Sequence, residues 1–596
     1  MKLRKAEKEW ILHQGPDIHV KEYINKTARR LGIPEEIIKF LAERGCTDER
    51  DIRDFLRPSL NLLPRPDLMK GMAEAIDILA DALKSPKPIT VYGDFDADGV
   101  TATAVLALFF AELDVPFQYY IPDRLKEGYG LNTEAVRTIY ETNKQQNGGP
   151  GIIITADCGI SDVKVVKAAK QLGFTVIVTD HHRPPPELPP ADAILNPLQP
   201  GCDFPCKDLA GVGVAFFLIL GLRSKLTKNS HWPADKIPNL KSCMDLVAIG
   251  TVADQVSITG CNRIIVRAGL EVINQENRIG LQRILKNANA LSVEVQAEDI
   301  AFRIAPRINA IGRIGSAGKA VELLTTDIPQ YAEKLAGELE DANNNRKKIE
   351  ADIFTEATHM VSTSTLETAH SLLLFKNNWH QGVLGIVASR LAESYGRPTI
   401  LLTGINRENV SEPDKDLVKG SGRSVEGLDI HAALLACQDM LVRFGGHEGA
   451  AGMTLHRDTV ESFRQRFDQA VAEQLVNRPP IPGITIDLET NLEFLLNTNF
   501  LSAYTLLAPF GNGNPEPVFC MTGKKLTKLR VVGNNHLRFT IVENGRNMDG
   551  IGFGFGNSIA EVENSLMDLA FHLKLNSYMG QNKWEIYTVA LRPSVH

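Results

Sequence analysis

Apolar and polar positions repeat with different periods in different parts of the 596-residue chain. Residues 1 to 80 place apolar side chains at helical spacing, as in IPEEIIKFLAER. From about residue 88, short β-branched runs such as PITVYG and GIIITA alternate with helical stretches, a pattern typical of a parallel sheet covered by helices. After about residue 470, short strand-like runs are separated by Gly, Asn and Pro, as in a small antiparallel barrel.

Between the two α/β stretches lies a long helical pattern that is polar on most of its surface, which indicates a helix joining two domains. We therefore predict an α/β fold in which a parallel-sheet domain is joined by this helix to a smaller α/β domain, followed by an all-β barrel of the oligonucleotide-binding (OB) type. The predicted boundaries are a helical N-terminal segment packed on the parallel-sheet domain (1–80), that domain (81–326), the connecting helix (327–360), the second α/β domain (361–465) and the OB-like domain (470–596).

The composition is that of a globular chain, because 43% of the residues are apolar and 23% are charged. The net charge of −7 does not exclude a nucleic-acid partner, since a basic surface acts locally. The eight cysteines have no zinc-site spacing, so we interpret Cys202 and Cys206 as structural or incidental. We expect no signal peptide and no membrane span, because the longest apolar run is shorter than ~20 residues. A cytoplasmic location follows as a prediction.

Three predicted strands end alike, because each apolar run stops at carboxylates or imidazoles. In an open parallel sheet, ligands bind in the crevice outside the carboxyl ends of the strands. A further apolar segment, DLVAIGTVADQV, contributes one more carboxylate. The side chains that would meet there are Asp94, Asp96, Asp98, Asp157, Asp180, His181, His182 and Asp254.

Carboxylates packed this closely repel one another unless cations lie between them. Mixed Asp and His ligands suit Mn²⁺ or Mg²⁺, and we predict two ions, with Asp96 and Asp98 facing different ions and Asp157 bridging them. Such a pair would activate water for in-line attack on phosphorus. A single Asp at a strand end is usually a helix cap or turn former, but repeated clusters at matching strand ends favour the metal site.

The segments DFDADG, TADCG, TDHH and GTVADQV, in this order, resemble the DHH phosphoesterase superfamily. Downstream, WHQGVLGIVASRL, SGRS and GGHEGAAG resemble its DHHA1 domain, and PRINAIGRIG and PFGNGNPEPVF resemble its branch of bacterial 5′→3′ exonucleases specific for single-stranded DNA. Tyr92 stands where pyrophosphatases of the superfamily carry a His, which disfavours that activity. The resemblance implies that His182 contacts the scissile phosphate or assists the leaving group, and that the metal ligands are Asp94, Asp96, Asp98, Asp157, His181 and Asp254.

Cationic side chains for a phosphate-rich substrate occur in residues 301–320, which contain no acid. We predict that Arg307, Asn309 and Arg313 hold the nucleotide backbone or the scissile phosphate. The predicted catalytic set is therefore Asp157, His181, His182 and Arg313. Two other cations of this segment are equally consistent with a solvated face, namely Arg303 and Lys319.

The SGRS segment offers a fork-shaped donor, Arg423, between the hydroxyls of Ser421 and Ser424, which suits a terminal phosphate. Gly446 would let the backbone approach a ligand that His447 also contacts. Residues 521–540 contain five basic residues and no acid, so they form either a DNA-binding face of the OB-like domain or a solubilising edge strand.

These features together predict a metal-dependent 5′→3′ exonuclease that degrades single-stranded DNA to 5′-mononucleotides in DNA repair and recombination. We expect the strand to enter a cleft between the two α/β domains that is too narrow for a duplex. The alternatives are a phosphodiesterase or phosphatase of the same superfamily that acts on short oligonucleotides, and a non-catalytic scaffold that binds single strands. The resemblance also implies a single-strand-binding protein and a helicase as partners. The sequence leaves the oligomeric state open, and we favour a monomer.

Overall fold

The computed structural model describes residues 9–12, 18–84, 87–124, 127–147, 149–228, 236–275, 278–290, 294–361, 368–405, 416–476, 483–576 and 583–594. The chain divides into two compact units. One unit comprises Arg313–Gly315 and the described part of Glu340–Pro482. The other comprises the described parts of Glu9–Gly312, Ser316–Leu339 and Gly483–His596.

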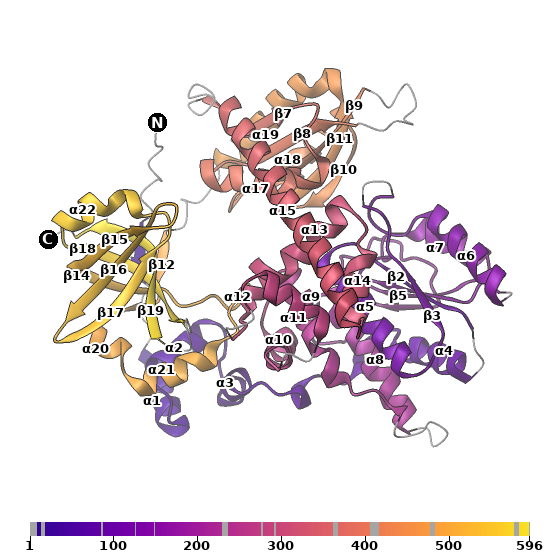
Figure 1. The fold of residues 1–596 in the computed structure, drawn as a ribbon, viewed down its shortest axis with the longest axis horizontal. Helices are drawn as coiled ribbons and strands as arrows, with labels where there is room; N and C mark the ends of the chain where they lie inside the picture. The colour runs from indigo at the N-terminus through magenta and orange to yellow at the C-terminus, as the bar shows by residue number, and fades with distance from the viewer. Residues whose placement is uncertain are drawn as a thin grey trace. The chain divides into compact units, whose positions relative to one another are not determined.

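The first sheet is parallel throughout, as predicted (Figure 1). Its strands are mostly buried, except the edge strand β3, which is half-buried. Helices α6 (Thr133–Asn147) and α7 (Val163–Gln171) share a core with one face of the sheet, while α5 (Ala97–Glu112) and α8 (Gly211–Lys228) contact it from other positions. This covering explains the continuous β-branched runs. In spatial order the strands are β3 (Phe117–Tyr120), β2 (Ile89–Gly93), β4 (Ile152–Ala156), β5 (Thr175–Thr179) and β6 (Ala193–Leu195).

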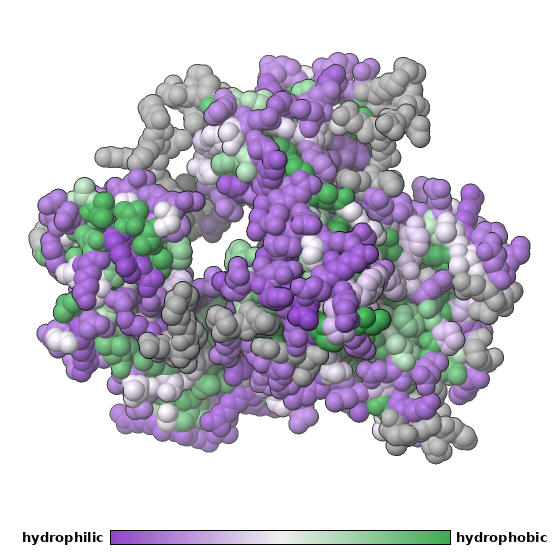
Figure 2. Space-filling model, viewed as in Figure 1, coloured by the Kyte–Doolittle hydropathy of each residue, from purple (hydrophilic) through white to green (hydrophobic). Residues whose placement is uncertain are grey.

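Helices complete this domain and lead to the connecting helix. Helix α9 (Met244–Ala253) is buried because it packs among α5, α8 and α10 (Gly260–Ile273). A π-helical turn at Ile300–Ile304 precedes α13 (Ala305–Ile314), which α14 (Gly318–Thr325) follows. The predicted connecting helix is α15 (Pro329–Met360), whose visible surface is mainly hydrophilic (Figure 2).

The second sheet is mixed, with the order β10, β11, β9, β8, β7. Helix α19 (Val460–Val476) packs Phe463, Phe467 and Val471 into the core of this domain. The predicted boundary at 465 to 470 is therefore too early, because it cuts through a packed helix. The strands are β7 (Leu372–Phe375), β8 (Thr399–Gly404), β9 (Leu417–Arg423), β10 (Leu441–His447) and β11 (Ala450–His456), and helix α17 (Leu384–Tyr395) lies between β7 and β8 in the chain.

The C-terminal domain is built on one sheet of seven strands, in keeping with the short strand-like runs of its sequence. Helices α20 (Leu492–Leu495), α21 (Thr498–Tyr504) and α22 (Ile559–Asn564) accompany the sheet. The strands, in spatial order, are β13 (Leu488–Glu489), β14 (Phe519–Lys524), β18 (Met567–Asn576), β19 (Lys583–Pro593), β17 (Arg546–Gly552), β16 (His536–Glu543) and β15 (Leu526–Val532).

The N-terminal helices differ from the prediction, because α1 (Ile18–Leu31), α2 (Glu35–Glu43) and α3 (Glu49–Leu56) share a core with the C-terminal domain. Phe40 of α2, for example, meets Phe519 edge to face at 6.2 Å between ring centroids. Helix α4 (Met72–Lys84) packs on the parallel-sheet domain, as predicted, through α8 and β6. Strand β1 (Trp10–Leu12) also pairs with β12 (Ile484–Ile486).

Two further observations concern the cysteines and the membrane. Cys206 is bonded to Cys261, a pairing that the sequence did not predict, whereas Cys202 is unbonded and buried. Across the described ranges, no helix combines the length and the apolar character that crossing a membrane requires.

Candidate metal centre

The carboxylates after β2 are held by backbone amides. Asp94 follows the strand directly, and its amide donates to the carbonyl of Ala156 on β4 at 3.1 Å. Asp96 caps α5 by accepting from the amides of Asp98 (3.0 Å) and Gly99 (3.1 Å). The two oxygens of Asp98 accept from Gly211 (2.6 Å) and Val212 (2.9 Å) at the start of α8. The loop is therefore fixed with its carboxylates at the edge of the sheet.

Asp157 follows β4 and adopts a left-handed backbone conformation, with φ of 66°. A side chain other than glycine rarely adopts such a φ without a structural or functional reason. The amide of Asp157 donates to Thr179 on β5 at 3.0 Å, and its carboxylate is buried. The backbone at this strand end therefore holds an acidic side chain at an unusual angle.

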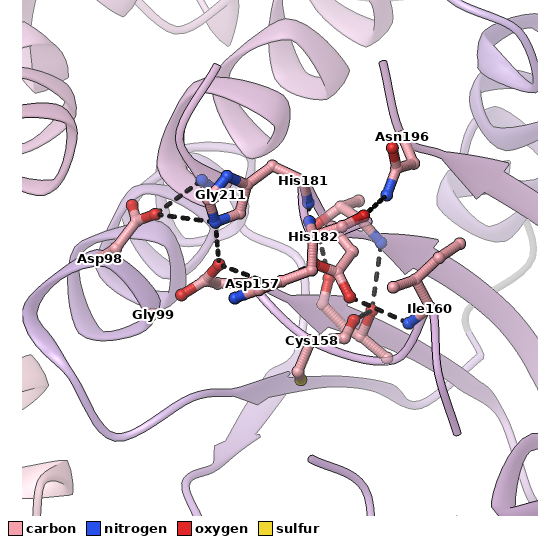
Figure 3. Close-up of polar contacts among 12 residues, drawn as sticks. Asp98, Gly99, Asp157, Cys158, Ile160, His181, His182, Asn196 and Gly211 are labelled. Carbon is pink, nitrogen blue, oxygen red and sulfur yellow. Dashed lines mark hydrogen bonds and ion pairs between the residues drawn. The ribbon is translucent and has the colours of Figure 1, made fainter. Parts of the chain in front are cut away.

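The strand end at Asp180-His181-His182 has a structural organiser. The buried carboxylate of Asp180 accepts hydrogen bonds from the amides of His181 (2.7 Å) and His182 (3.0 Å) and from Nδ1 of the His182 ring (2.7 Å). Its other oxygen accepts from the amide of Ile160 at 2.9 Å, and Asn196 holds the carbonyl of His182 (Figure 3). Asp180 thus shapes the turn that orients both imidazoles, a role that the sequence did not reveal.

The six predicted ligands come together at the carboxyl edge of the sheet. Nε2 of His181 lies 3.2 Å from Oδ1 of Asp157, 3.5 Å from Oδ2 of Asp254 and 4.0 Å from Oδ2 of Asp98. Figure 3 shows Asp98, Asp157 and His181 reaching toward one another from separate elements. Three overlapping groups have ligand atoms within 4.8 Å of one another: Asp94, Asp96 and Asp157; Asp98, His181 and Asp254; and Asp157, His181 and His182.

Three buried atoms of this cluster lack a hydrogen-bond partner: Oδ1 of Asp94, Oδ1 of Asp157 and Nε2 of His181. A buried polar atom without a partner is costly. Burial and the neighbouring carboxylates raise the pKa of Asp94, Asp98 and Asp157 well above the usual range, and that of Asp254 to about 7. A dication between these groups would give the buried atoms a partner and would stabilise the charged form of the carboxylates. Oxygen and imidazole ligands fit Mn²⁺ or Mg²⁺.

The two adjacent imidazoles have opposite environments. Burial, together with the neighbouring His182, lowers the pKa of His181 to about 4, so this ring is neutral at pH 7, as a metal ligand must be. Burial also acts against protonation of His182, but the hydrogen bond and charge of Asp180 outweigh it and raise the pKa of His182 to about 9. The pair therefore combines a ligand with a potential proton donor.

Two residues beside the cluster were missed by the sequence analysis. The hydroxyl of Tyr129 lies 3.2 Å from Nδ1 of His182 and donates to the carbonyl of Asp157 at 3.4 Å. The guanidinium of Arg124 lies 4.8 Å from the centroid of the Phe95 ring and interacts electrostatically with Asp94 and Asp96. Both residues follow β3, so the rule that parallel strands share a carboxyl edge was the signal that would have found them.

The PRINAIGRIG segment forms most of α13, and part of it braces the acidic loop. The side-chain oxygen of Asn309 accepts from the amide of Ala97 at 2.8 Å, so this oxygen positions the start of α5. Arg307 is buried and donates to the carbonyl of Arg303, and Arg313 donates to the carbonyl of Gly382. Substrate contacts for these three residues remain a prediction.

The SGRS and GGH segments lie at the ends of β9 and β10, the two strands that flank β11 in the second sheet. Arg423 pairs with Ala450 on β11, and Ala450 pairs with His447 on β10, so the three side chains share one face. Arg423 contacts the hydroxyl of Ser421 at 3.1 Å, while Ser424 donates to the carbonyl of Leu428. A Cβ at Gly446 would lie 2.3 Å from a carbonyl oxygen of β11, so the adjacent strand already requires glycine here, and the approach to a ligand stays a prediction.

The basic residues of the C-terminal domain are only partly neutralised. Strand β15 is an edge strand, on which Lys528 and Arg530 are exposed. Lys524 pairs with Glu543 at 2.5 Å, and Arg538 pairs with Glu585 at 2.8 Å. Both interpretations of this strand, a DNA-binding face and a solubilising edge, are compatible with this arrangement.

The parallel sheet with clustered carboxylates at its carboxyl edge defines a phosphoesterase of the DHH class, and comparison with protein families shows the same. Residues 88–251 match the DHH family, N-terminal domain, and residues 366–473 match the DHHA1 domain. Residues 486–589 match the RecJ OB domain. The chain belongs to the RecJ family of single-stranded-DNA-specific exonucleases.

Relatives of known name support this assignment over nearly the whole chain. The RecJ exonuclease of Bacillus subtilis is 37% identical over 96% of this chain and 69% of its own length. That of Thermus thermophilus is 33% identical over 91% of this chain and 73% of its own length. The crystal structure of RecJ from Thermus thermophilus in complex with Mn²⁺ superposes with a TM-score of 0.78 at 30% identity, covering 100% of this chain and 81% of that one.

Proposed function

We propose that the chain is a metal-dependent exonuclease that degrades single-stranded DNA in the 5′→3′ direction to 5′-mononucleotides, in DNA repair and recombination. The observation that carries the proposal is the cluster of carboxylates and imidazoles in which one buried oxygen each of Asp94 and Asp157 lacks a hydrogen-bond partner. Relatives that are named single-stranded-DNA-specific exonucleases, and solved relatives with Mn²⁺ and with Mg²⁺, support it.

Two ions fit the ligand groups. Asp94, Asp96 and Asp157 would hold one ion, and Asp98, His181 and Asp254 would hold the other, with Asp157 between them. When bound, such ions lower the pKa of water and stabilise negative charge on the leaving oxygen. The backbone amides that hold Asp96 and Asp98 keep these ligands in place, which limits the cost of ordering them during the reaction.

His182 is the residue best placed to act on the phosphate. Its side chain is 45% exposed, and Asp180 fixes its ring through Nδ1. An oriented imidazole that is accessible to the substrate can donate a proton to the departing 3′-oxygen or contact the scissile phosphate. Tyr129, which lies beside the ring, limits its rotation further.

Substrate binding would use the cationic residues outside the cluster. We assign Arg423, Ser421, Ser424 and His447 to the 5′ end, Arg307 and Arg313 to the nucleotide backbone, and the C-terminal domain to the trailing strand. We further expect a monomer in the cytoplasm, acting beside a single-strand-binding protein and a helicase.

Digestion of end-labelled DNA tests the proposal. With Mn²⁺, a 5′-labelled single strand should release its label first as a mononucleotide, a 3′-labelled strand should shorten progressively, and a blunt duplex should persist. Asp157→Ala should remove this activity. Faster hydrolysis of a dinucleotide than of a long strand would favour the short-oligonucleotide alternative, and full activity in chelator would contradict the metal requirement.

A further inference from the structure

The segment Pro509–Phe519, PFGNGNPEPVF, has no part in the site described so far, although it belongs to the motifs that mark the family. We infer that its Gly511–Asn514 turn positions the metal ligand Asp254, by holding the loop that follows this residue. The inference rests on the metal site proposed above. It makes the C-terminal domain a structural support of the catalytic centre in addition to a DNA-binding attachment.

The turn contacts the loop directly after Asp254. Asp254 ends helix α9, and Gln255 then adopts a left-handed conformation with φ of 60°. The side-chain amide of Asn512 donates to the carbonyl of Gln255 at 2.8 Å. In return, the amide of Ile258 donates to the carbonyl of Asn512 at 2.7 Å. One residue of the C-terminal domain therefore binds the loop at both of its ends.

The turn is shaped to fit this loop closely. Gly511 and Asn514 exchange two backbone hydrogen bonds, at 2.9 and 3.1 Å, which close the turn. Gly513 has φ of 72°, and a Cβ at this position would lie 2.1 Å from the hydroxyl oxygen of Ser257. Glycine therefore suits this position, because it adopts the positive φ without strain and leaves the Ser257 hydroxyl in place.

A buried arginine fixes the segment before the turn. Arg263 lies on α10, the helix that follows the loop, and its side chain is almost fully buried. Its guanidinium stacks on Phe55 at 3.7 Å from the ring centroid and donates to the carbonyl of Phe55 at 2.9 Å. It also donates, over 2.8 to 3.3 Å, to the carbonyls of Leu506, Leu507, Ala508 and Pro509.

Asn514 and Arg44 complete the attachment. The side-chain amide of Asn514 donates to the carbonyls of Leu507 and Pro509, and its oxygen accepts from Arg44 at 2.8 Å. Arg44 also donates to the carbonyl of Pro515 at 2.6 Å. The turn is thus held from both sides, so it is a rigid support for the loop that it contacts.

The carboxylate of Asp254 is held differently from that of Asp98. The carboxylate of Asp98 is bound by two backbone amides. Within the part of the chain that the structure describes, no backbone amide donates to the carboxylate of Asp254, which lies 3.5 Å from Nε2 of His181 and has a ligand oxygen within 4.8 Å of one of Asp98. The position of Asp254 therefore depends on its own backbone, and groups that orient metal ligands typically contribute to metal affinity.

The test is Mn²⁺ binding to the full-length protein carrying Asn512→Ala. Titration calorimetry should show that one of the two ions binds about 10-fold more weakly, with little change in melting temperature. Hydrolysis should return to the unaltered rate at saturating Mn²⁺, and affinity for single-stranded DNA in chelator should not change. Asn547→Ala, at an exposed asparagine of β17 in the same domain, is the matched control and should leave Mn²⁺ binding unaltered.

Gly513→Ala should weaken the same ion further, because its Cβ displaces the turn. Since that variant is prone to misfold, Asn512→Ala decides the matter. Unaltered Mn²⁺ binding by Asn512→Ala overturns the inference and leaves the proposed function standing, as does a loss of activity that excess Mn²⁺ does not restore. A full-length protein that binds no Mn²⁺ at all overturns the proposed function, and this inference with it.

Discussion

Two groups of polar side chains differ in their burial and in their hydrogen-bond partners. One lies at the carboxyl edge of the first sheet, and the other consists of Arg423 and His447, which share one face of the second sheet. The first gathers buried carboxylates and an imidazole, and one ligand atom in each of three of these side chains lacks a hydrogen-bond partner. The second presents an exposed His447 and a half-buried Arg423 that already contacts Ser421. Buried groups without partners require a ligand to offset their cost, whereas exposed groups are satisfied by water. The first site should therefore govern chemistry and metal binding, and the second should govern substrate affinity.

The largest effect should come from Asp157→Asn, which removes a charge shared by two ligand groups and keeps the volume. We expect kcat to fall by about 10³-fold or more. In the unaltered protein, Mn²⁺ at 100 times its Kd should stabilise the fold by about 2.7 kcal/mol per site, and chelator should remove this gain. Thermal melts with and without Mn²⁺ measure it. A full Mn²⁺-induced shift in Asp157→Asn would show that the cluster does not hold the metal.

Asp180→Asn should have the next largest effect, although Asp180 belongs to no ligand group. The change weakens the hydrogen bonds that set the backbone and ring of His182 and the amide of His181. We expect Mn²⁺ affinity to fall by about 10-fold to 100-fold, the usual range for groups that orient ligands. Calorimetric titration measures this, with Asp192→Asn as the control, since Asp192 pairs with Lys170 instead. Equal affinity in both variants would contradict the positioning role.

The sequence predicted the metal cluster because a general rule places the ends of parallel strands at one edge. That rule needs only the strands ending at Gly93, Ala156 and Thr179 and the carboxylates that follow them. The same rule could not tell that Asp180 belongs to no ligand group. An aspartate at a strand end has the same sequence context whether its carboxylate binds a metal or backbone amides. The structure shows which amides it accepts from.

Long-range packing was the other limit of sequence reasoning. The apolar faces of α1 to α3 are evident from their spacing, but nothing local tells which surface they cover, and they cover the C-terminal domain. Asn309 and Gly446 were assigned to the substrate on the basis of motif alone. In the structure, the side-chain oxygen of Asn309 accepts a hydrogen bond from the amide of Ala97. The backbone of β11 leaves no room for a Cβ at Gly446.

Arg423→Ala tests whether the polar residues of the second sheet govern substrate affinity. Charge-assisted hydrogen bonds contribute about 1.5–3 kcal/mol, so we expect KM for a 5′-phosphorylated single strand to rise about 10-fold, and KM for a 5′-hydroxyl strand to rise less. The value of kcat and Mn²⁺ affinity should not change. Arg466→Ala, on α19 and paired with Asp439, is the control. A fall in kcat with KM unchanged would place Arg423 in the chemical step instead.

The smallest effect should come from the edge strand β15, because its basic side chains are exposed and water satisfies them without a ligand. The double variant Lys528→Ala, Arg530→Ala removes two exposed cations, so the slope of log affinity against log salt for single-stranded DNA should flatten by roughly 1.4. Hydrolysis at saturating DNA should persist. Lys583→Ala, whose lysine already pairs with Asp549, should change the slope less. Equal slopes in all three proteins would make β15 a solubilising edge, because a strand that contacts phosphates must release counterions when it binds.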